Sequence, residues 1–264
     1  MEQQDLFLSC VIPAFNEASR LPESLPPLRA WADAQSWAYE VLVVDDGSAD
    51  DTAGVVTRMA REWAQLRLVR GPHQGKGGAV RAGVLAAQGQ HVALADADFS
   101  MPAKEFSRFL VPPAADCDVA LGSREAPGAM RFSEPGYRHI MGRVFDRLVQ
   151  VAVLPGIEDT QCGFKLMRHA VAVDLCQHQT LTGWGFDVEL LVIARERGYS
   201  LCEVPIPWHY MAGSRVNPIR DTLTMVADVA HVWRNRRAGI YAKGLTPQAG
   251  RAETPAGIAT PAEQ

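Results

Sequence analysis

The sequence contains few cysteines, and their spacing matches no known framework. The five cysteines among its 264 residues include no CxxC pair, which excludes a disulfide framework and the ligand spacing of a zinc site. We therefore expect them to be small buried hydrophobic side chains in a reducing cytosol. They are Cys10, Cys117, Cys162, Cys176 and Cys202.

Long hydrophobic runs are also missing. The strongest candidate, residues 144–157, is interrupted by Asp146, Arg147 and Pro155, and no run approaches the roughly 18 apolar residues of a membrane span. The first nine residues carry acidic side chains and no basic segment, so no secretory signal is recognised. These absences predict a cytoplasmic protein that is soluble or lies peripherally on the cytoplasmic face of a membrane.

No one sign of charge dominates. The chain has 26 Lys and Arg against 30 Asp and Glu, whereas a dedicated nucleic-acid-binding protein is usually basic, so we expect no nucleic-acid partner. Hydrophobic residues make up 47% and charged residues 21%, which excludes wholesale disorder. The length suits one α/β domain with an appendage.

Short apolar runs, each closed by Gly, Pro or Asp, alternate with segments of helical periodicity in the first half of the chain. This alternation predicts an α/β fold with a doubly wound, mostly parallel sheet. In such a sheet, ligands bind beyond the carboxyl ends of the strands. The predicted strands are residues 6–12, 39–44, 66–69 and 92–95, and the predicted helices are residues 19–33, 51–63 and 76–87.

The second half of the chain has a looser pattern. Residues 122–136 are rich in turn-forming residues and predict a loop. Residues 244–264 offer almost nothing to bury and predict a disordered tail. The remaining predicted elements are helices at residues 137–153, 185–197 and 219–237 and a strand at residues 201–204.

Polar clusters fall where successive strands are expected to end. Asn16 and Glu17 follow the first strand, and Asp45 and Asp46 follow the second; taken singly, these residues could be helix caps and turns. The glycine-rich segment beginning at Gly75-Lys76 lacks the P-loop spacing, but it offers backbone N–H groups and a cation to an anion. The coincidence of these clusters at strand ends favours a ligand site.

The fourth cluster, Asp96-Ala97-Asp98, has the clearest chemistry. Two carboxylates two residues apart at a strand end can bind one hard cation, Mg²⁺ or Mn²⁺, whose other positions suit phosphate oxygens and water. Such a cation neutralises the charge on a departing diphosphate. The cluster therefore predicts a nucleoside-diphosphate donor and transfer of the group attached to it.

Taken in order, the motifs resemble those of the family-2 inverting glycosyltransferases with the GT-A fold. Within that family, the chain is similar to the dolichyl-phosphate or polyprenyl-phosphate glucose and mannose synthases. The motifs DTQCGFK and GWGFDVELL look closest to the glucose-transferring branch. The resemblance covers residues 6–237. The motifs are VIPAFNE (11–17), VLVVDDGSADDT (41–52), GKGGAVRAG (75–83), ALADADFSMP (93–102), DVALGSR (118–124), DTQCGFKL (159–166), GWGFDVELL (183–191) and EVPIPW (203–208).

The resemblance implies a single GT-A catalytic domain over residues 1–237, followed by a disordered tail over 238–264. Its nucleotide-sugar-binding half is residues 1–123, and its acceptor half is residues 124–237. The implied reaction is metal-dependent, inverting transfer of a hexose, glucose from UDP-glucose, to a polyprenyl or dolichyl phosphate. GDP-mannose as donor and a soluble acceptor remain alternatives. A nucleotidyltransferase and a non-catalytic nucleotide-sugar-binding module are more distant ones.

The resemblance also implies roles for individual residues. Asp96 and Asp98 are the DxD metal motif, with Ala97 beside the ribose and diphosphate. Arg124 is expected near the donor sugar phosphate. Asp187 is expected near the acceptor, either as a catalytic base or only as a favourable charge at a helix N-terminus. The nucleotide pocket would be lined by Pro13, Ala14, Glu17, Val44 and Asp46, with Lys76 on the donor.

Basic residues of the second half are candidates for binding the acceptor. The predicted helix at 219–237 is amphipathic, and packing on the sheet accounts for its apolar stripe. The surplus of positive charge around it suits an interfacial helix on anionic lipid. Five basic residues are either part of a solvated surface or a clamp on the donor and acceptor phosphates. They are Arg138, Arg143, Lys165, Arg215 and Arg220.

Overall fold

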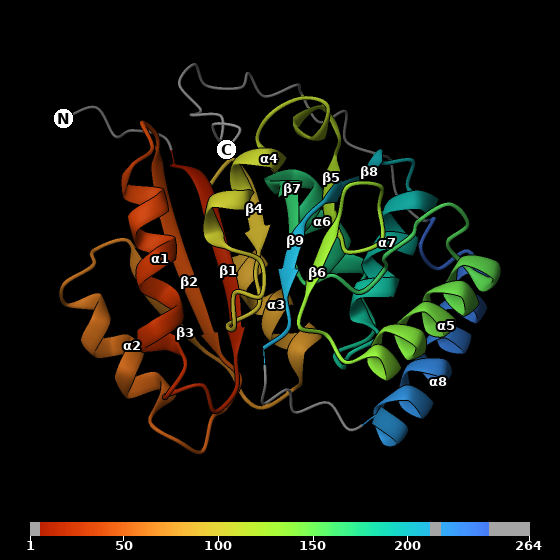
Figure 1. Ribbon diagram of the computed structural model, residues 1–264, viewed down its shortest axis with the longest axis horizontal. Coiled ribbons are helices and arrows are strands. Elements are labelled where there is room, and N and C mark those ends of the chain that lie inside the picture. Colours follow the sequence, from red (N-terminus) through yellow and green to blue (C-terminus); the bar gives the residue numbers. More distant parts are fainter. Residues whose placement is uncertain (1–5, 212–217, 243–264) are drawn as a thin grey trace.

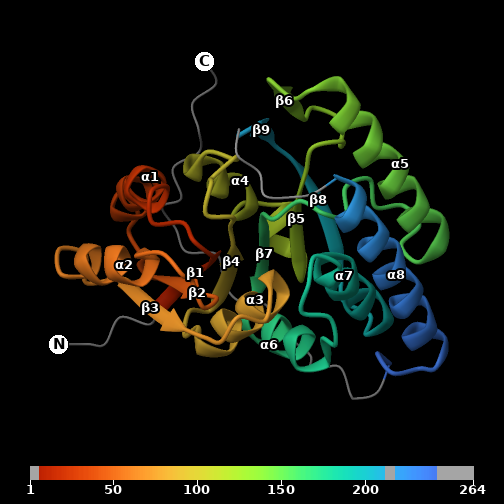
Figure 2. The same cartoon turned by 90° about the horizontal axis from the view of Figure 1, so that it is seen from below.

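A seven-stranded sheet runs through the centre of the molecule, with helices on both faces (Figure 1, Figure 2). The computed structural model describes residues 6–211 and 218–242, except for the side chains of residues 137–138 and 218–223. The strand order is β3-β2-β1-β4-β7-β5-β8, and β6 and β9 form a separate two-stranded sheet.

The first half of the chain forms the parallel part of the large sheet. β1 pairs with β2 and β4, and β2 pairs with β3, all in parallel. A helix follows each of the first three strands, because parallel neighbours need a crossover connection. The predicted doubly wound, mostly parallel α/β fold is confirmed. The elements are β1 (Leu6–Ala14), α1 (Leu21–Asp33), β2 (Ala38–Asp45), α2 (Thr52–Ala60), β3 (Leu66–Arg70), α3 (Lys76–Ala86) and β4 (His91–Leu94).

The second half extends the sheet and reverses one strand. β7 lies antiparallel between β4 and β5, and β8 pairs in parallel with β5. The loop predicted over residues 122–136 contains β6, because a three-residue strand paired with distant β9 leaves no periodic signal. The elements are η1 (Ala103–Glu105), α4 (Phe106–Phe109), η2 (Ala114–Asp116), β5 (Val119–Ser123), β6 (Met130–Phe132), α5 (Gly136–Ala152), β7 (Lys165–Arg168), α6 (His169–His178), α7 (Phe186–Glu196), β8 (Leu201–Pro205), β9 (Pro207–His209) and α8 (Pro218–Arg237).

The sheet separates two hydrophobic cores. In β1, Val11 packs in the core that includes α3, α6 and α7, whereas Ile12 packs in the core that includes α1, α2 and α4. Successive side chains of a strand point to opposite faces, so a strand covered on both faces is apolar along its length. Two polar side chains inside these strands, Ser9 and Glu40, satisfy each other, since the Ser9 hydroxyl donates to Glu40 Oε1 at 2.7 Å. The candidate site lies at the carboxyl ends of the strands.

One pair of cysteines differs from the prediction that all five are reduced. Cys117 and Cys202 form a disulfide across 85 residues of sequence, with their Cα atoms 6.1 Å apart. Cys117 precedes β5 and Cys202 lies in neighbouring β8, so the sheet brings together two residues whose sequence spacing gives no indication of pairing. Cys10, Cys162 and Cys176 are free and buried, as predicted.

The ordered packing continues beyond Arg237, where the predicted catalytic domain ends. Tyr241 is fully buried, and its hydroxyl donates to Glu189 Oε1 at 2.8 Å. The folded domain therefore continues to at least Tyr241. The predicted end at residue 237 came from the end of the helical pattern in the sequence, which does not record this packing. The rest of the predicted tail, residues 243–264, lies outside the described residues. Within the described part of the chain, no helix is both long and apolar enough to cross a bilayer.

Candidate active site

The first two polar clusters of the sequence interlock at the carboxyl ends of β1 and β2. Asn16 Oδ1 accepts a hydrogen bond from the backbone N–H of Ala49 at 2.7 Å, and the Asn16 N–H donates to Ser48 Oγ at 2.8 Å. The Glu17 N–H donates to Thr52 Oγ1 at 2.8 Å. Parallel neighbours bring these loops to one edge of the sheet, so the two clusters form one structure.

Asp46 organises the glycine-rich loop before α3. Its two carboxylate oxygens accept hydrogen bonds from the backbone N–H groups of Gln74 and Gly75, at 2.8 and 2.9 Å. Gly75 has a φ of 97°, a conformation that favours glycine. His73 Nδ1 lies 2.8 Å from the same carboxylate, and the His73 ring stacks on Phe15 at 4.3 Å. Neither ring was assigned a role from the sequence: Phe15 stands in the VIPAFNE motif between the residues selected there, and His73 lies just before the glycine-rich segment.

The predicted nucleotide-pocket residues differ in their accessibility. Pro13 and Glu17 are partly exposed at the end of β1, whereas Ala14 is buried beside them and its carbonyl accepts from the Asp46 N–H at 2.9 Å. Val44 can reach the predicted pocket only through its backbone. Its side chain is buried in the core close to Gly83, because it points inward from β2, so only its backbone lies near the sheet edge.

Asp96 and Asp98 lie just beyond β4, and Lys76 at the start of α3 reaches them. The Lys76 ammonium lies 2.6 Å from Asp96 Oδ1. Gly163 permits this arrangement from the other side, since a Cβ on it would come within 2.2 Å of Asp96 Oδ2. Ala97, between Asp96 and Asp98 in the sequence, is buried in the hydrophobic core. The three polar residues of the predicted donor site thus meet at one point.

The electrostatics of this group suit a divalent cation. Burial and the neighbouring Asp96 carboxylate raise the pKa of Asp98 above its ordinary value, which shows two like charges held close together. Burial lowers the pKa of Lys76, but the carboxylates of Asp96 and Asp187 outweigh it, and the net shift is upward. With Lys165 included, the three carboxylates of Asp96, Asp98 and Asp187 lie near only two ammonium groups, those of Lys76 and Lys165. The surplus negative charge and the hard oxygen donors of Asp96 and Asp98 fit Mg²⁺ or Mn²⁺.

Among the described residues, no group of three or more His, Cys, Asp and Glu side chains could hold a metal ion. A cation at Asp96 and Asp98 would therefore need oxygens from a ligand to complete its coordination. Mg²⁺ is commonly bound in this way, through one or two carboxylates together with substrate phosphates. The donor set fits a shared metal site rather than a closed protein site.

Asp187 lies in the first turn of α7, where its carboxylate is buried and paired with Lys165. The Lys165 ammonium also donates to the Cys162 carbonyl at 2.6 Å. Burial raises the pKa of Asp187 although Lys165 and Lys76 oppose this. Lys165 does not lie on the surface as a phosphate clamp requires, because β7, on which it lies, is an interior strand.

Arg124, directly after β5, is anchored by a buried carboxylate. Its Nε and Nη2 donate to the two oxygens of Asp159 at 2.7 and 2.9 Å, and its guanidinium lies 5.5 Å from the centre of the Trp208 ring. Asp159 is fully buried, and Arg124 lowers the pKa of its carboxyl despite that burial. The two-point pairing fixes both the position and the plane of the guanidinium.

Two further carboxylates, the partly buried Glu203 and the buried Asp146, hold the loop that carries Asp159. Glu203 of β8 accepts from the backbone N–H groups of Glu158 and Asp159 at 2.9 and 3.0 Å. Asp146 of α5 accepts from Thr160 Oγ1 at 3.1 Å. Burial and the nearby Asp159 raise the pKa of Asp146 to about 7. The sequence assigned neither residue a role, although Glu203 opens the EVPIPW motif, since an acidic residue in a strand or a helix gives no signal of the loop that it supports.

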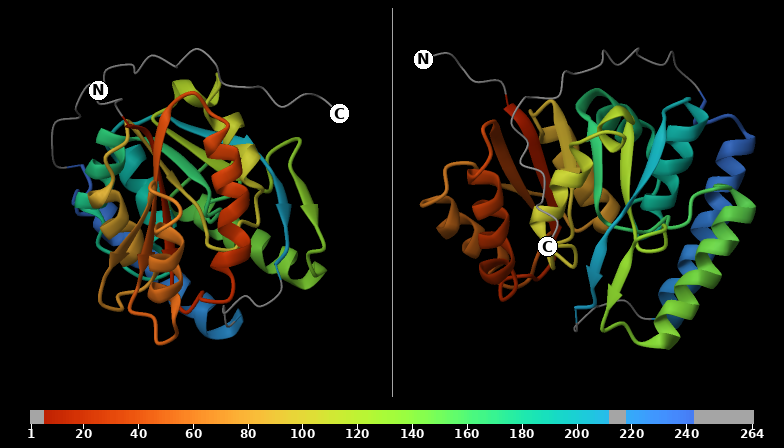
Figure 3. Two further views of the ribbon diagram at one scale, coloured as in Figure 1. Left: turned by 90° about the vertical axis from the view of Figure 1, so that its left-hand side faces the viewer. Right: turned by 45° about the horizontal axis from the view of Figure 1, so that its top comes forward.

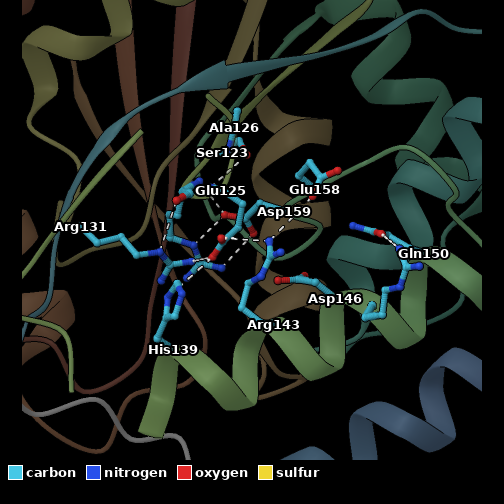
Figure 4. A network of polar contacts seen from close by, with 12 residues as sticks. Ser123, Glu125, Ala126, Arg131, His139, Arg143, Asp146, Gln150, Glu158 and Asp159 are labelled. Atoms are coloured by element: carbon cyan, nitrogen blue, oxygen red, sulfur yellow. Dashed lines mark hydrogen bonds and ion pairs between the residues drawn. The ribbon is translucent and has the colours of Figure 1, made fainter. Parts of the chain in front are cut away.

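The predicted acceptor residues are only partly described. Arg143 is exposed on α5 and pairs with Glu125 at 3.0 Å and with Glu158 at 3.8 Å (Figure 4). Its position beside the Arg124 network agrees with either a surface ion pair or a phosphate contact. The side chains of Arg138 and Arg220 and the whole of Arg215 lie outside the described residues.

A doubly wound α/β sheet binds its ligand beyond the carboxyl ends of the strands, and a carboxylate pair with a lysine at that edge suits a phosphorylated ligand and a divalent cation. The model of the family described as Glycosyl transferase family 2 matches residues 9–175. The chain belongs to this family and is a glycosyltransferase.

Similar proteins include several dolichyl-phosphate beta-glucosyltransferases. One from Trichomonas vaginalis is 33% identical over 249 residues, covering 90% of this chain and 74% of the relative. One from Drosophila melanogaster is 33% identical over 261 residues, covering 91% and 78%. One from Saccharomyces cerevisiae is 31% identical over 263 residues, with the same two coverages of 91% and 78%. The predicted resemblance to this group is confirmed.

Solved structures agree on the fold. Glucosyl-3-phosphoglycerate synthase from Mycobacterium tuberculosis, in complex with Mn²⁺, UDP-glucose and phosphoglyceric acid, superimposes with a TM-score of 0.64 at 17% identity, covering 89% of this chain and 80% of that one. Mannosyl-3-phosphoglycerate synthase from Rubrobacter xylanophilus gives a TM-score of 0.65 at 17% identity, covering 89% and 76%. The predicted GT-A fold is confirmed.

Proposed function

We propose that this glycosyltransferase moves glucose from UDP-glucose to a polyprenyl phosphate of the dolichyl type, with inversion at the anomeric carbon and with a divalent metal. The observation that carries the proposal is the meeting of Asp96, Asp98 and Lys76 at the carboxyl edge of the sheet, with the charge of Asp187 acting on Lys76 from the acceptor half. The substrate assignment is supported by the relatives named as dolichyl-phosphate beta-glucosyltransferases.

The proposed roles follow from the position of each charge. Asp96 and Asp98 would hold Mg²⁺ or Mn²⁺, which supplies positive charge to the diphosphate leaving group. Lys76 would contact that diphosphate, since its ammonium lies beside the same carboxylates. The loops after β1 and β2, with Pro13, Glu17 and the Phe15 ring, would hold the nucleoside.

The transfer itself is a displacement at the anomeric carbon of glucose. An oxygen of the acceptor phosphate forms the new bond to that carbon, while the bond to the β-phosphate oxygen of UDP breaks and takes its electron pair. Attack on the face opposite UDP inverts the α-linked donor to a β-linked product. Arg124, held in one plane by Asp159, would bind a phosphate oxygen in this geometry.

A phosphate acceptor changes what is required of Asp187. An alcohol must lose a proton during attack and needs a general base within hydrogen-bond reach. A phosphate monoester is already an anion near neutral pH, with a second pKa of about 6. The buried pairing of Asp187 with Lys165 then serves to set the field at the acceptor side and the charge of Lys76. We propose this orienting role in place of proton abstraction.

The test is transfer of label from UDP-glucose or GDP-mannose, with Mg²⁺ or Mn²⁺ and polyprenyl phosphate in detergent, followed by organic extraction. The proposal expects label in the organic phase from UDP-glucose and none from GDP-mannose. Entry of mannose alone would overturn the donor assignment. Release of UDP with all label left in the aqueous phase would overturn the lipid acceptor and favour a soluble one.

A further inference from the structure

Helix α5 presents an apolar face to the outside of the molecule as well as one to the core. On its inner face, Phe145 and Val149 are buried in the core. On its outer face, Ile140, Val144 and Val151 are 64%, 66% and 77% exposed. Their spacing of four and seven residues puts them on one side of the helix. A surface helix normally covers its outward side with polar residues, so this face needs a partner.

The neighbouring helix α8 widens this apolar surface. α5 and α8 lie side by side at one edge of the molecule (Figure 1, Figure 3). Of the thirteen exposed large hydrophobic side chains in the described part of the chain, five are on α5 and two on α8. We call these seven the outer face. They are Ile140, Met141, Val144, Leu148, Val151, Val226 and Trp233.

The exposed charges on α5 and α8 themselves have one sign where the structure describes their side chains, and Arg143 is paired with Glu125 of the neighbouring loop. Among the side chains that the structure describes on α5 and α8, every exposed charged one is an arginine. Arg237 stacks on Trp233, with its guanidinium 4.3 Å from the ring centre. Apolar and aromatic side chains bordered by basic ones are the pattern of helices that lie in a membrane interface. The arginines are Arg143, Arg147, Arg234 and Arg237.

The same charges argue against a second copy of the chain as the partner. A two-fold dimer joins the same patch of both subunits, so it would bring the four arginines of one copy towards those of the other. An anionic bilayer offers the opposite charge together with apolar depth. The outer face is also a convex pair of helices, which a flat and fluid surface can cover without a complementary groove.

We propose that the outer face of α5 and α8 docks this chain on an anionic lipid bilayer. The proposal deepens the proposed function, and rests on it, in that the bilayer is the source of a polyprenyl phosphate. α5 also links the surface to the site, because Arg143 on it pairs with Glu125, next to Arg124 in the sequence (Figure 4). On the inner side of α5, Asp146 accepts a hydrogen bond from Thr160. Docking through α5 therefore sets the Arg124 network beside the lipid headgroups.

The test is sedimentation with lipid vesicles, in the absence of donor and acceptor. The vesicles are phosphatidylcholine alone or phosphatidylcholine with about a third phosphatidylglycerol, a composition that carries the surface charge that basic segments recognise. The wild-type chain is expected to sediment with the anionic vesicles, and added salt should weaken the binding. Val144→Glu/Val151→Glu should weaken it by at least about tenfold, because both carboxylates would enter the apolar layer.

Matched variants separate docking from misfolding. Leu85→Glu places the same charge on an exposed hydrophobic residue of α3, away from the outer face, and should bind vesicles like the wild type. The double variant Arg147→Gln/Arg234→Gln should bind anionic vesicles less tightly than the wild type does, while its binding to vesicles of phosphatidylcholine alone should not change. Thermal melting checks that each variant is folded.

Several outcomes would overturn the proposal. These are a wild-type chain that stays in the supernatant with anionic vesicles, a folded Val144→Glu/Val151→Glu variant that binds normally, and a wild-type dimer in analytical ultracentrifugation that this variant converts to a monomer. The vesicle assay uses no sugar nucleotide, so its failure leaves glucosyl transfer in detergent untouched. Conversely, binding without any glucosyl transfer would count against the proposed function alone.

Discussion

Lys76 and Asp96 form an ion pair, with 2.6 Å between Nζ and Oδ1, that joins the start of α3 to the end of β4. The lysine supplies positive charge to a carboxylate that would otherwise lie next to Asp98 unbalanced. The aromatic rings of Trp184 and Phe186 lie 5.5 and 5.8 Å from the same ammonium. One lysine thus connects the nucleotide half with the loop at the start of α7.

Replacing this lysine should separate metal binding from transfer. Lys76→Met leaves Asp96 without its ion pair, so Mn²⁺ alone should bind more tightly in a calorimetric titration. Turnover should nevertheless fall by about 10²-fold or more, because a positive charge for the leaving diphosphate is lost. Lys104→Met, at an exposed lysine in η1, is the control. Unchanged Mn²⁺ affinity would show that the pair does not compete with the metal.

Asp98→Ala should abolish transfer while the fold remains intact. Its carboxylate is proposed as a metal ligand, and it is packed against Asp96 at some cost in electrostatic repulsion. Removal of that repulsion should leave the melting temperature unchanged or slightly raised. Calorimetry should show loss of Mn²⁺-dependent UDP binding. Metal-dependent turnover at the wild-type rate would contradict the assignment.

Asp187→Asn should destabilise the protein as well as slow it. The substitution leaves the buried Lys165 ammonium without its partner, which costs about 3–5 kcal/mol of unfolding free energy. The double variant Asp187→Asn/Lys165→Met removes both charges and should recover most of the melting temperature. Its turnover should stay low, since the field at the acceptor side is not restored. Full recovery of turnover would reduce the pair to a structural role.

Asp146 should make stability depend on pH. Its pKa of about 7 in the folded protein lies above the ordinary value of 3.8, so the folded state binds more protons than the unfolded state between these values. Stability should therefore fall as the pH rises from about 4 to 7, and level off above 7, by a few kcal/mol. Asp146→Asn, measured by chemical denaturation at pH 5 and 8, should flatten this dependence. Parallel pH profiles for both proteins would exclude Asp146 as the cause.

The C-terminal residues should differ in their effect on stability. Tyr241→Phe removes the hydrogen bond to buried Glu189 and should cost about 1–2 kcal/mol. Deletion of residues 244–264 should leave the melting temperature unchanged, because their composition offers little to bury. Differential scanning calorimetry of both variants checks the contrast. A clear drop on deletion would show that these residues pack on the domain.

The sequence predicted the architecture of the first half well, for a local reason. Apolar runs such as residues 41–44 are buried on both faces of the sheet, so each of these positions requires a hydrophobic side chain. Their closing residues must be polar, and Asp46 and Asp96 were found in that way. β6 was missed because its three residues owe their conformation to β9, about 75 residues away.

The individual partners within the site were not predictable from the sequence. Arg124 and Asp159 both lie in motifs that the sequence analysis used, but nothing in their spacing of 35 residues indicates a bidentate pair. The burial of Lys165 was missed for a related reason. A lysine in a four-residue strand is predicted to lie on the surface, because lysine is rarely buried, until the strand is known to lie inside the sheet.

The sequence by itself determined the family through the order of its motifs. It also determined the doubly wound sheet and the edge at which chemistry occurs, because periodicity and the residues that close each strand are local properties of the chain. Only the tertiary structure decided that Lys76 meets Asp96, that Asp187 is buried against Lys165, and that α5 carries an apolar face outward. These facts depend on strand order and on which helix faces stay uncovered. Both are set by packing between residues far apart in the chain, which no local pattern records.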